Sequence, residues 1–194
     1  MEQEEPRVHH RRKFTEGLID TDRILASLDI EHGQTVLDAG CGTGYFSRLL
    51  SDEVGENGMV YAVDRNENGF EALRSGPALA NVKLVVADFT KDIPIAKGSV
   101  DVFYLSTALH LQSGGLVQGL IREIKRVLRP GGTLAIVEIE KREMNFGPPM
   151  HLRRTPAELI AAMPFQPVET VKVSEHFYLQ VFRNGCHGTE EGVS

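Results

Sequence analysis

From Thr35 onward the sequence alternates short apolar runs with longer stretches that have helical periodicity. Five of these runs are rich in β-branched and aliphatic residues, as strands are, and they cover residues 35–38, 59–64, 82–87, 100–106 and 133–138. Because the runs are almost continuously apolar, both faces of each strand should be buried. The alternation therefore predicts an α/β fold built on parallel strands.

The stretches between and around these runs predict helices at about 20–28, 45–53, 69–75 and 116–127. Pro130-Gly131-Gly132 is expected to stop the last of these. Thr155-Pro156-Ala157-Glu158 combines an N-cap residue, a proline at the first helical position and a capping box, so a further helix should run to about Met163.

Two more apolar runs, at about 168–173 and 177–182, are separated only by Ser174-Glu175-His176. A link of this length is too short for a parallel crossover, so the two runs should pair in antiparallel fashion at one edge of the sheet. With the five earlier runs they predict a sheet of seven strands.

With 194 residues, 41% of them hydrophobic and 25% charged, the chain has the composition of a globular protein. We predict one domain over residues 1–194 that begins with an N-terminal cap segment at 1–30. The stretch 140–154 contains Gly147-Pro148-Pro149 and has no clear periodicity, so it is expected to be a lid-like loop. The polar, glycine-rich stretch 184–194 is expected to be a frayed tail.

The charge balance and the cysteine content exclude several classes of partner. The formal net charge of −6 provides no global positive field for nucleic acid, and no apolar run approaches the ~20 residues of a membrane span. The acidic start lacks the apolar segment of a secretory signal. Cys41 and Cys186 are isolated and suggest neither a disulfide framework nor a metal site, so we expect no metal and a cytoplasmic location.

A glycine-rich motif, Val36-Leu37-Asp38-Ala39-Gly40-Cys41-Gly42-Thr43-Gly44, lies where the first strand meets the first following helix. Glycines at such a junction allow a tight turn and let a ligand approach backbone N–H groups. The spacing is G-x-G-x-G rather than the G-x-G-x-x-G of dinucleotide-binding proteins. Asp38 would repel a pyrophosphate but would suit a cationic ligand group such as an ammonium.

Three consecutive strands end in an aspartate: Asp38, Asp64 and Asp88. The carboxyl ends of strands form the ligand crevice of open α/β sheets. Asp64 lies 20 residues after Gly44, where an acid can accept hydrogen bonds from both hydroxyls of a ribose, and Asp88 places a further acceptor along the same edge. Together the three acids predict a nucleoside-type ligand.

These residues resemble those of the class I S-adenosylmethionine-dependent methyltransferases, most closely the methyltransferase type 11 group and its quinone-biosynthesis relatives. The resemblance covers about residues 28–139 and extends from the glycine-rich motif through Val60-Tyr61-Ala62-Val63-Asp64 and Ala87-Asp88 to Leu128-Arg129-Pro130-Gly131-Gly132-Thr133-Leu134. It implies a Rossmann-like, doubly wound, mostly parallel sheet with an antiparallel edge strand.

The resemblance also implies a cofactor, S-adenosylmethionine, and a role for each matching residue. Asp38 and Gly40 would hold its amino-acid end, and Gly42 and Gly44 would leave room for it. Asp64 would bind the ribose diol, with Arg65 beside the adenine. Asp88 would accept a hydrogen bond from the adenine amino group, with the Phe89 backbone at a ring nitrogen, and Ser106 and Thr107 would contact the methionine part through backbone atoms.

Methyl transfer from a sulfonium is an in-line displacement that depends mainly on positioning, so the expected acceptor is a small molecule held close to the methyl group. A general base is needed only for a protonated acceptor, and His110 is the candidate for that role or for a structural one. The basic run 7–13 suits either an anionic substrate or a solvated tail, and the stretch 140–154 either an acceptor pocket or packing over the sheet. Two alternatives remain: a nicotinamide-dependent oxidoreductase and a non-catalytic module that binds the cofactor.

Overall fold

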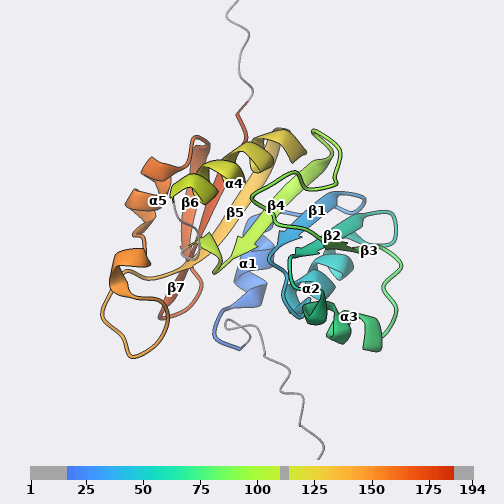
Figure 1. Cartoon of the computed structure of the whole chain (residues 1–194), viewed down its shortest axis with the longest axis horizontal. Helices are drawn as coiled ribbons and strands as arrows, with labels where there is room; N and C mark the ends of the chain where they lie inside the picture. Colours follow the sequence, from blue (N-terminus) through green and yellow to red (C-terminus); the bar gives the residue numbers. More distant parts are fainter. Residues whose placement is uncertain (1–16, 110–113, 186–194) are drawn as a thin grey trace, which may run out of the picture.

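A computed structural model describes residues 17–109 and 114–185 of the chain, so the basic run 7–13, His110 and Cys186 lie outside the described residues. Its centre is a seven-stranded sheet in the order β3-β2-β1-β4-β5-β7-β6 (Figure 1). The strands are β1 (Thr35–Ala39), β2 (Met59–Asp64), β3 (Val82–Val86), β4 (Val100–Ser106), β5 (Leu128–Ile139), β6 (Gln166–Lys172) and β7 (Phe177–Arg183).

Strands β1 to β5 pair in parallel, whereas β7 is antiparallel to both β5 and β6. The predicted α/β class and the antiparallel pair at one edge are therefore confirmed. Within that pair the reversed strand β7 lies against β5, and β6 takes the outermost position. This order lets β7 be buried on both faces while β6 stays exposed along most of its length.

Helices cover both faces of this sheet (Figure 1). They are α1 (Thr21–Leu28), α2 (Tyr45–Val54), α3 (Glu71–Ser75), α4 (Gly114–Val127) and α5 (Pro156–Ala162), with short 3-10 turns η1 (Glu67–Phe70) and η3 (Met150–Leu152). Residues of α1 and α2 such as Ile24 and Leu50 share one core with Val36 of β1. Residues of α4 and α5 such as Ile124 and Leu159 form the opposite core. The sheet is thus doubly wound.

The helix before Pro130-Gly131-Gly132 ends at Val127 as predicted, but the predicted start of the next strand at Thr133 is wrong. Helix α4 ends at Val127 and strand β5 begins at Leu128, so these three residues lie inside the strand. Gly131 has a φ of +74°, and its N–H donates to Asn184 O beyond β7. The backbone freedom of glycine lets the strand bend here while keeping a partner, at the point where the β4–β5 register also shifts.

No helix in the described part of the chain is long and apolar enough to cross a membrane.

Helix α5, which packs on the same face of the sheet as α4, begins with the predicted capping box. Thr155 Oγ1 accepts from Glu158 N, and Glu158 Oε2 accepts from Thr155 N. Its buried residue Leu159 reaches the core between α4 and β7. The cap therefore fixes where α5 starts relative to the sheet.

Replacing this cap should destabilise the protein measurably. We expect Thr155→Ala to lower the free energy of unfolding by about 1 kcal/mol, because the Glu158 N–H loses its acceptor. Thr155→Ser keeps the hydroxyl and should stay close to the wild type. Urea denaturation of the three proteins checks this, and equal midpoints for the Ala and Ser variants would contradict it.

Candidate functional site

The direction of winding reverses between β1 and β4. The chain leaves β1 into α2 on one face of the sheet, and it leaves β4 towards α4 on the other face. Side chains and loops diverge at such a switch point and leave a crevice at the carboxyl ends of the strands. The segments at this point of the sheet are the glycine loop 40–44 after β1, and Ser106 and Thr107 at the end of β4.

The glycine loop needs its glycines for conformation and for close packing. Gly40, Gly42 and Gly44 have φ values of +68°, +57° and +74°, a region that other residues seldom adopt. A Cβ atom on Gly44 would lie closer than 3.0 Å to the Leu73 side chain, whereas one on Gly42 would meet no atom within 4 Å. The loop is therefore packed against Leu73 at Gly44, whereas there is open space beside the Gly42 Cα.

Asp64, at the end of β2, is joined directly to this loop. Its Oδ2 accepts a hydrogen bond from Gly42 N at 2.9 Å, and its Oδ1 accepts one from Asn66 N at 2.9 Å. Gly69 in η1 lies so close to the Gly42 carbonyl that a side chain there would collide with it. Two of the predicted cofactor residues, Gly42 and Asp64, thus lie together.

Asp88 and Phe89 follow β3, and Phe89 lies against the glycine loop. Asp88 Oδ1 accepts from Thr90 N at 3.0 Å and from Thr90 Oγ1 at 2.6 Å. These bonds, chiefly the one from the hydroxyl, hold the pKa of Asp88 below its ordinary value, so it is a carboxylate at neutral pH. Phe89 Cε1 lies 3.3 Å from the position of a Cβ on Gly40, and Ala108 Cβ lies 3.7 Å from it. Segments after β1, β3 and β4 therefore meet at Gly40.

Asp38 lies deeper than its neighbours. Its side chain is completely buried on the α2 face, where Oδ2 accepts a hydrogen bond from Ser47 Oγ at 2.6 Å. Tyr104 of β4 is its register partner and stacks on Phe46 of α2, and burial raises the pKa of that tyrosine. The Asp38 side chain is thus tied to α2, and its contact with the amino-acid end of a cofactor stays a prediction.

The remaining predicted residues border the crevice to different degrees. Arg65 is exposed and follows Asp64 directly, whereas Ser106 is buried at the end of β4. Thr107 adopts a φ of +52° and donates its N–H to Val137 O of β5. This turn redirects the chain away from the sheet just before His110.

Glu138, near the end of β5, was missed by the sequence reasoning. It is 2% exposed, and Oε1 accepts a hydrogen bond from Leu109 N at 3.0 Å. It therefore fixes the turn that follows β4. The signal that could have identified it is the one that identified the three aspartates, an acidic residue at a strand end.

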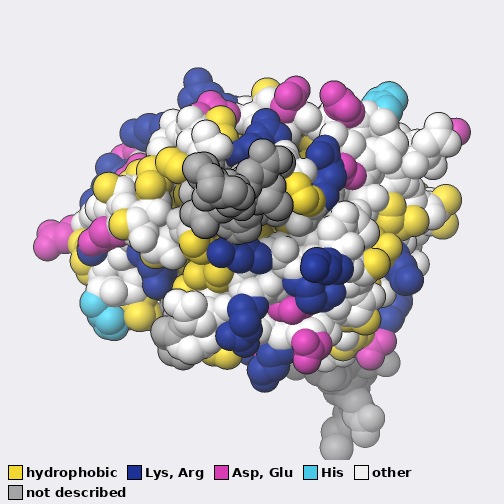
Figure 2. All heavy atoms as spheres, turned by 90° about the horizontal axis from the view of Figure 1, so that it is seen from above, with side chains coloured by type: hydrophobic (Ala, Val, Ile, Leu, Met, Phe, Trp, Pro, Cys, Tyr) yellow, Lys and Arg dark blue, Asp and Glu magenta, His cyan; other side chains and the backbone are white. Residues whose placement is uncertain are grey.

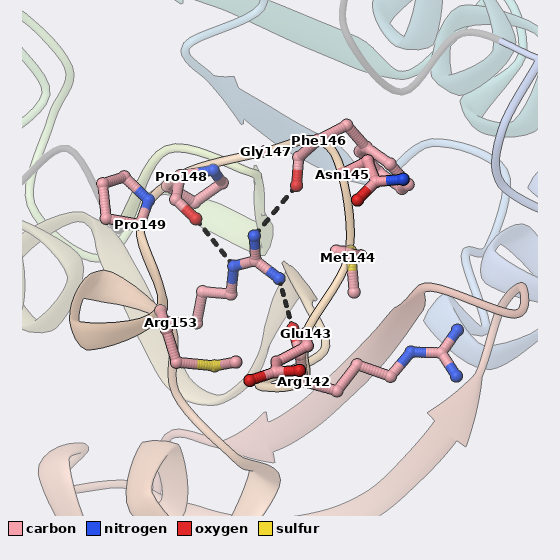
Figure 3. Close-up of a pocket in the computed structure, with 10 residues that line it drawn as sticks. Arg142, Glu143, Met144, Asn145, Phe146, Gly147, Pro148, Pro149 and Arg153 are labelled. Atoms are coloured by element: carbon pink, nitrogen blue, oxygen red, sulfur yellow. Dashed lines mark hydrogen bonds between the residues drawn. The ribbon is translucent and has the colours of Figure 1, made fainter.

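The loop 140–154 leaves the same edge of the sheet from the end of β5, and a buried arginine holds it in shape. The Arg153 side chain reaches into the middle of the loop (Figure 3). Its Nε donates to Pro148 O, its Nη1 to Arg142 O and its Nη2 to Phe146 O, at 2.7, 2.7 and 2.9 Å. Since Arg153 is 5% exposed, these three carbonyls replace water around its charge. These three hydrogen bonds therefore give the loop a defined conformation.

A cavity of about 500 Å³ opens within this loop and is lined by Arg142, Glu143, Met144, Asn145, Phe146, Gly147, Pro148, Pro149, Met150 and Arg153. Met144 and Phe146 also pack against the core that α1 and α2 share. Packing on the body of the protein is therefore observed for this stretch, and a role of its cavity as an acceptor pocket stays a prediction.

Removing the Arg153 side chain should loosen this loop. We expect Arg153→Met to lower the free energy of unfolding by about 2–4 kcal/mol, because three loop carbonyls lose the charged donor that holds them together. Arg142→Met is the control, since its side-chain bonds to Glu175 and His176 are exposed and should be worth under about 1 kcal/mol. Chemical denaturation measures both, and similar losses in the two variants would show that Arg153 has no special role.

Among residues 17–109 and 114–185 there is no group of three or more His, Cys, Asp or Glu side chains placed to hold a metal ion.

The fold, the switch-point glycine loop and the acids at the strand ends define a Rossmann-like protein of the methyltransferase class. A family model described as a methyltransferase domain matches residues 30–179, so the chain belongs to this methyltransferase-domain family. It is 28% identical to an S-adenosylmethionine-dependent methyltransferase from Aquifex aeolicus, with a TM-score of 0.78 over 89% of this chain and 93% of that one.

Two further comparisons are more distant or partial. A putative type 11 methyltransferase from Sulfolobus solfataricus shares the fold at 21% identity, with a TM-score of 0.66 over 82% of this chain and 87% of that one. A demethylmenaquinone methyltransferase from Staphylococcus aureus is 31% identical over 133 residues, which are 68% of this chain and 54% of the relative. The chain thus spans about half the length of the curated relatives it matches.

Proposed function

We propose that the protein is an S-adenosylmethionine-dependent methyltransferase that acts on a small molecule. The observation that carries this proposal is the meeting of the glycine loop with Asp64 and Phe89 at the switch point, where Gly42 N–H binds Asp64 and the Phe89 ring lies against Gly40. Membership of the methyltransferase-domain family supports the same chemistry.

The geometry of Asp64 suits a ribose. An ionised carboxylate has about four lone-pair sites, and Gly42 N and Asn66 N occupy two of them. One site on each oxygen therefore remains for the two neighbouring hydroxyls of a ribose. Because the backbone holds the carboxylate, it need not reorganise to accept them.

The other assignments follow the carboxyl edge of the sheet. Asp88, ionised and partly exposed, would accept from the adenine amino group, with Phe89 and Arg65 beside the base. Gly42 presents an open backbone surface to the ligand. At the other end, the backbone of Thr107 would face the methionine part.

The sulfonium cofactor supplies an activated methyl group, and its thioether leaves without needing a proton. The task of the protein is then to hold the acceptor in line and to exclude water. The loop 140–154 is our candidate for this work, and what supports it is that the loop begins three residues after Val137, the β5 partner of Ser106. Apolar side chains in its cavity, Met144, Phe146 and Met150, suit an acceptor with an apolar part.

Charge favours a small acceptor over a nucleic acid. Basic side chains gather across the middle of the face shown in Figure 2, but acidic side chains border them, and the chain as a whole has a formal net charge of −6. Nucleic-acid binding draws most of its affinity from concentrated positive charge. The Staphylococcus aureus relative is named for a quinone substrate, and a quinone is one acceptor to assay.

Calorimetric titration with S-adenosylhomocysteine tests the cofactor assignment. We expect binding, and we expect Asp64→Ala to weaken it about 5- to 150-fold, the equivalent of roughly 1–3 kcal/mol for a lost charged hydrogen-bond acceptor. Asp52→Ala is the matched control, because Asp52 is an exposed acid in the last turn of α2, near the amino ends of the strands and away from the carboxyl ends. Binding of NADH in place of S-adenosylhomocysteine would contradict the proposal.

Transfer of a radiolabelled methyl group from the cofactor into fractionated small-molecule and protein extracts then tests catalysis. We expect label in the small-molecule fraction. Cofactor binding with no labelled product in any fraction would point to the non-catalytic alternative.

A further inference from the structure

Thr90 is the group that orients Asp88. The Thr90 hydroxyl and N–H both donate to Asp88 Oδ1, which leaves Oδ2 as the outer oxygen. Lys91 approaches Oδ2 at 3.4 Å, but its side chain is 70% exposed, so this pair is weak and can open. Thr90 itself is 2% exposed and cannot turn away without disturbing its surroundings.

Gly119 of helix α4 packs closely against Thr90. A Cβ atom on Gly119 would lie closer than 3.0 Å to the Thr90 carbonyl oxygen, a separation that real Cβ atoms essentially never show. Gly119 is therefore needed for close approach, although its position inside a helix otherwise disfavours glycine. The helix rests directly on the backbone of the residue that orients Asp88.

The same helix fixes the segment that follows Thr90. Glu123 is 6% exposed and accepts from Ile93 N at 2.8 Å, while Arg126 binds Glu123 and donates to Ile93 O and Ile95 O. The Arg126 bond holds the pKa of Glu123 below its ordinary value, so the pair is charged at neutral pH. These bonds tie Ile93 and Ile95, just after Thr90, to α4.

We propose that α4, through Gly119 and Thr90, positions Asp88 to distinguish adenine from other purines. Gly119 and Thr90 are positioning residues, since they act through the Asp88 carboxylate. The inference rests on the proposed function, in which Asp88 accepts a hydrogen bond from the adenine amino group. It adds that selectivity for adenine depends on the packing of Gly119 against Thr90, a contact that the base itself does not touch.

The amino group gives this proposal a specific measure. In the analogue of S-adenosylhomocysteine that carries unsubstituted purine, a hydrogen atom replaces the amino group and the ring nitrogens are unchanged, so the Asp88 carboxylate has no donor to bind. The ratio of the two dissociation constants reports how well Asp88 is placed. General loosening of the protein weakens both ligands alike and leaves the ratio unchanged.

The first test compares two glycines of the same helix. Gly119→Ala should push the Thr90 backbone away and reduce the ratio at least about threefold, out of the roughly tenfold or greater selectivity that a charged hydrogen bond provides. Gly115→Ala is the matched control, because a Cβ on Gly115 meets no atom within 4 Å. Its ratio should equal that of the wild type.

A second pair keeps the proposal testable if Gly119→Ala does not fold. Thr90→Val removes the hydroxyl at nearly constant shape and should reduce the ratio of the dissociation constants. Thr90→Ser keeps the hydroxyl, so its ratio should equal that of the wild type. An unchanged ratio in Gly119→Ala, or in Thr90→Val where the former is unfolded, would overturn the inference and leave cofactor binding intact. If the wild type binds neither ligand, the proposed function itself fails.

Discussion

The hydrogen bond from the Gly42 N–H to Asp64 Oδ2 connects the two parts on which the site depends, the loop after β1 and the end of β2. The loop reaches this position because its three glycines take positive φ values and because Gly69 leaves room for the Gly42 carbonyl. The chain's own contacts therefore give the loop its shape. A loop shaped in advance loses little conformational entropy when a ligand meets it, and this favours affinity.

Local pattern was enough to predict most of the sheet and to suggest candidates for part of the site. Strands β2 and β4 lie where the apolar runs placed them, since burial on both faces requires a continuous apolar run wherever the strand sits. Asp64 and Asp88 were identifiable for a related reason, because a position at a strand end is a local property. The start of β5 was not predictable, since Gly131 is held in the strand by Asn184, which is distant in sequence.

The residues that hold the loops of the candidate site in place could not be predicted either, because their roles also come from contacts with other segments. Arg153 resembles any other arginine of a basic stretch until the loop carbonyls surround its guanidinium. Gly119 resembles a weak point in a helix until the Thr90 carbonyl is seen against it. In each case the role comes from a contact between segments, and neither spacing nor composition records such a contact.

The two helical layers support different parts of the crevice. On the α2 face, Ser47 binds Asp38 just before the glycine loop, and Leu73 of α3 packs against Gly44. On the α4 face, Gly119 and Glu123 hold the segment after β3 that carries Asp88. A protein interior is close-packed, so a change in one core first displaces the segment that rests directly on it. In the proposed function a ligand bound across the switch point therefore contacts segments supported by both cores, and these segments meet at Gly40, where Phe89 and Ala108 approach the loop.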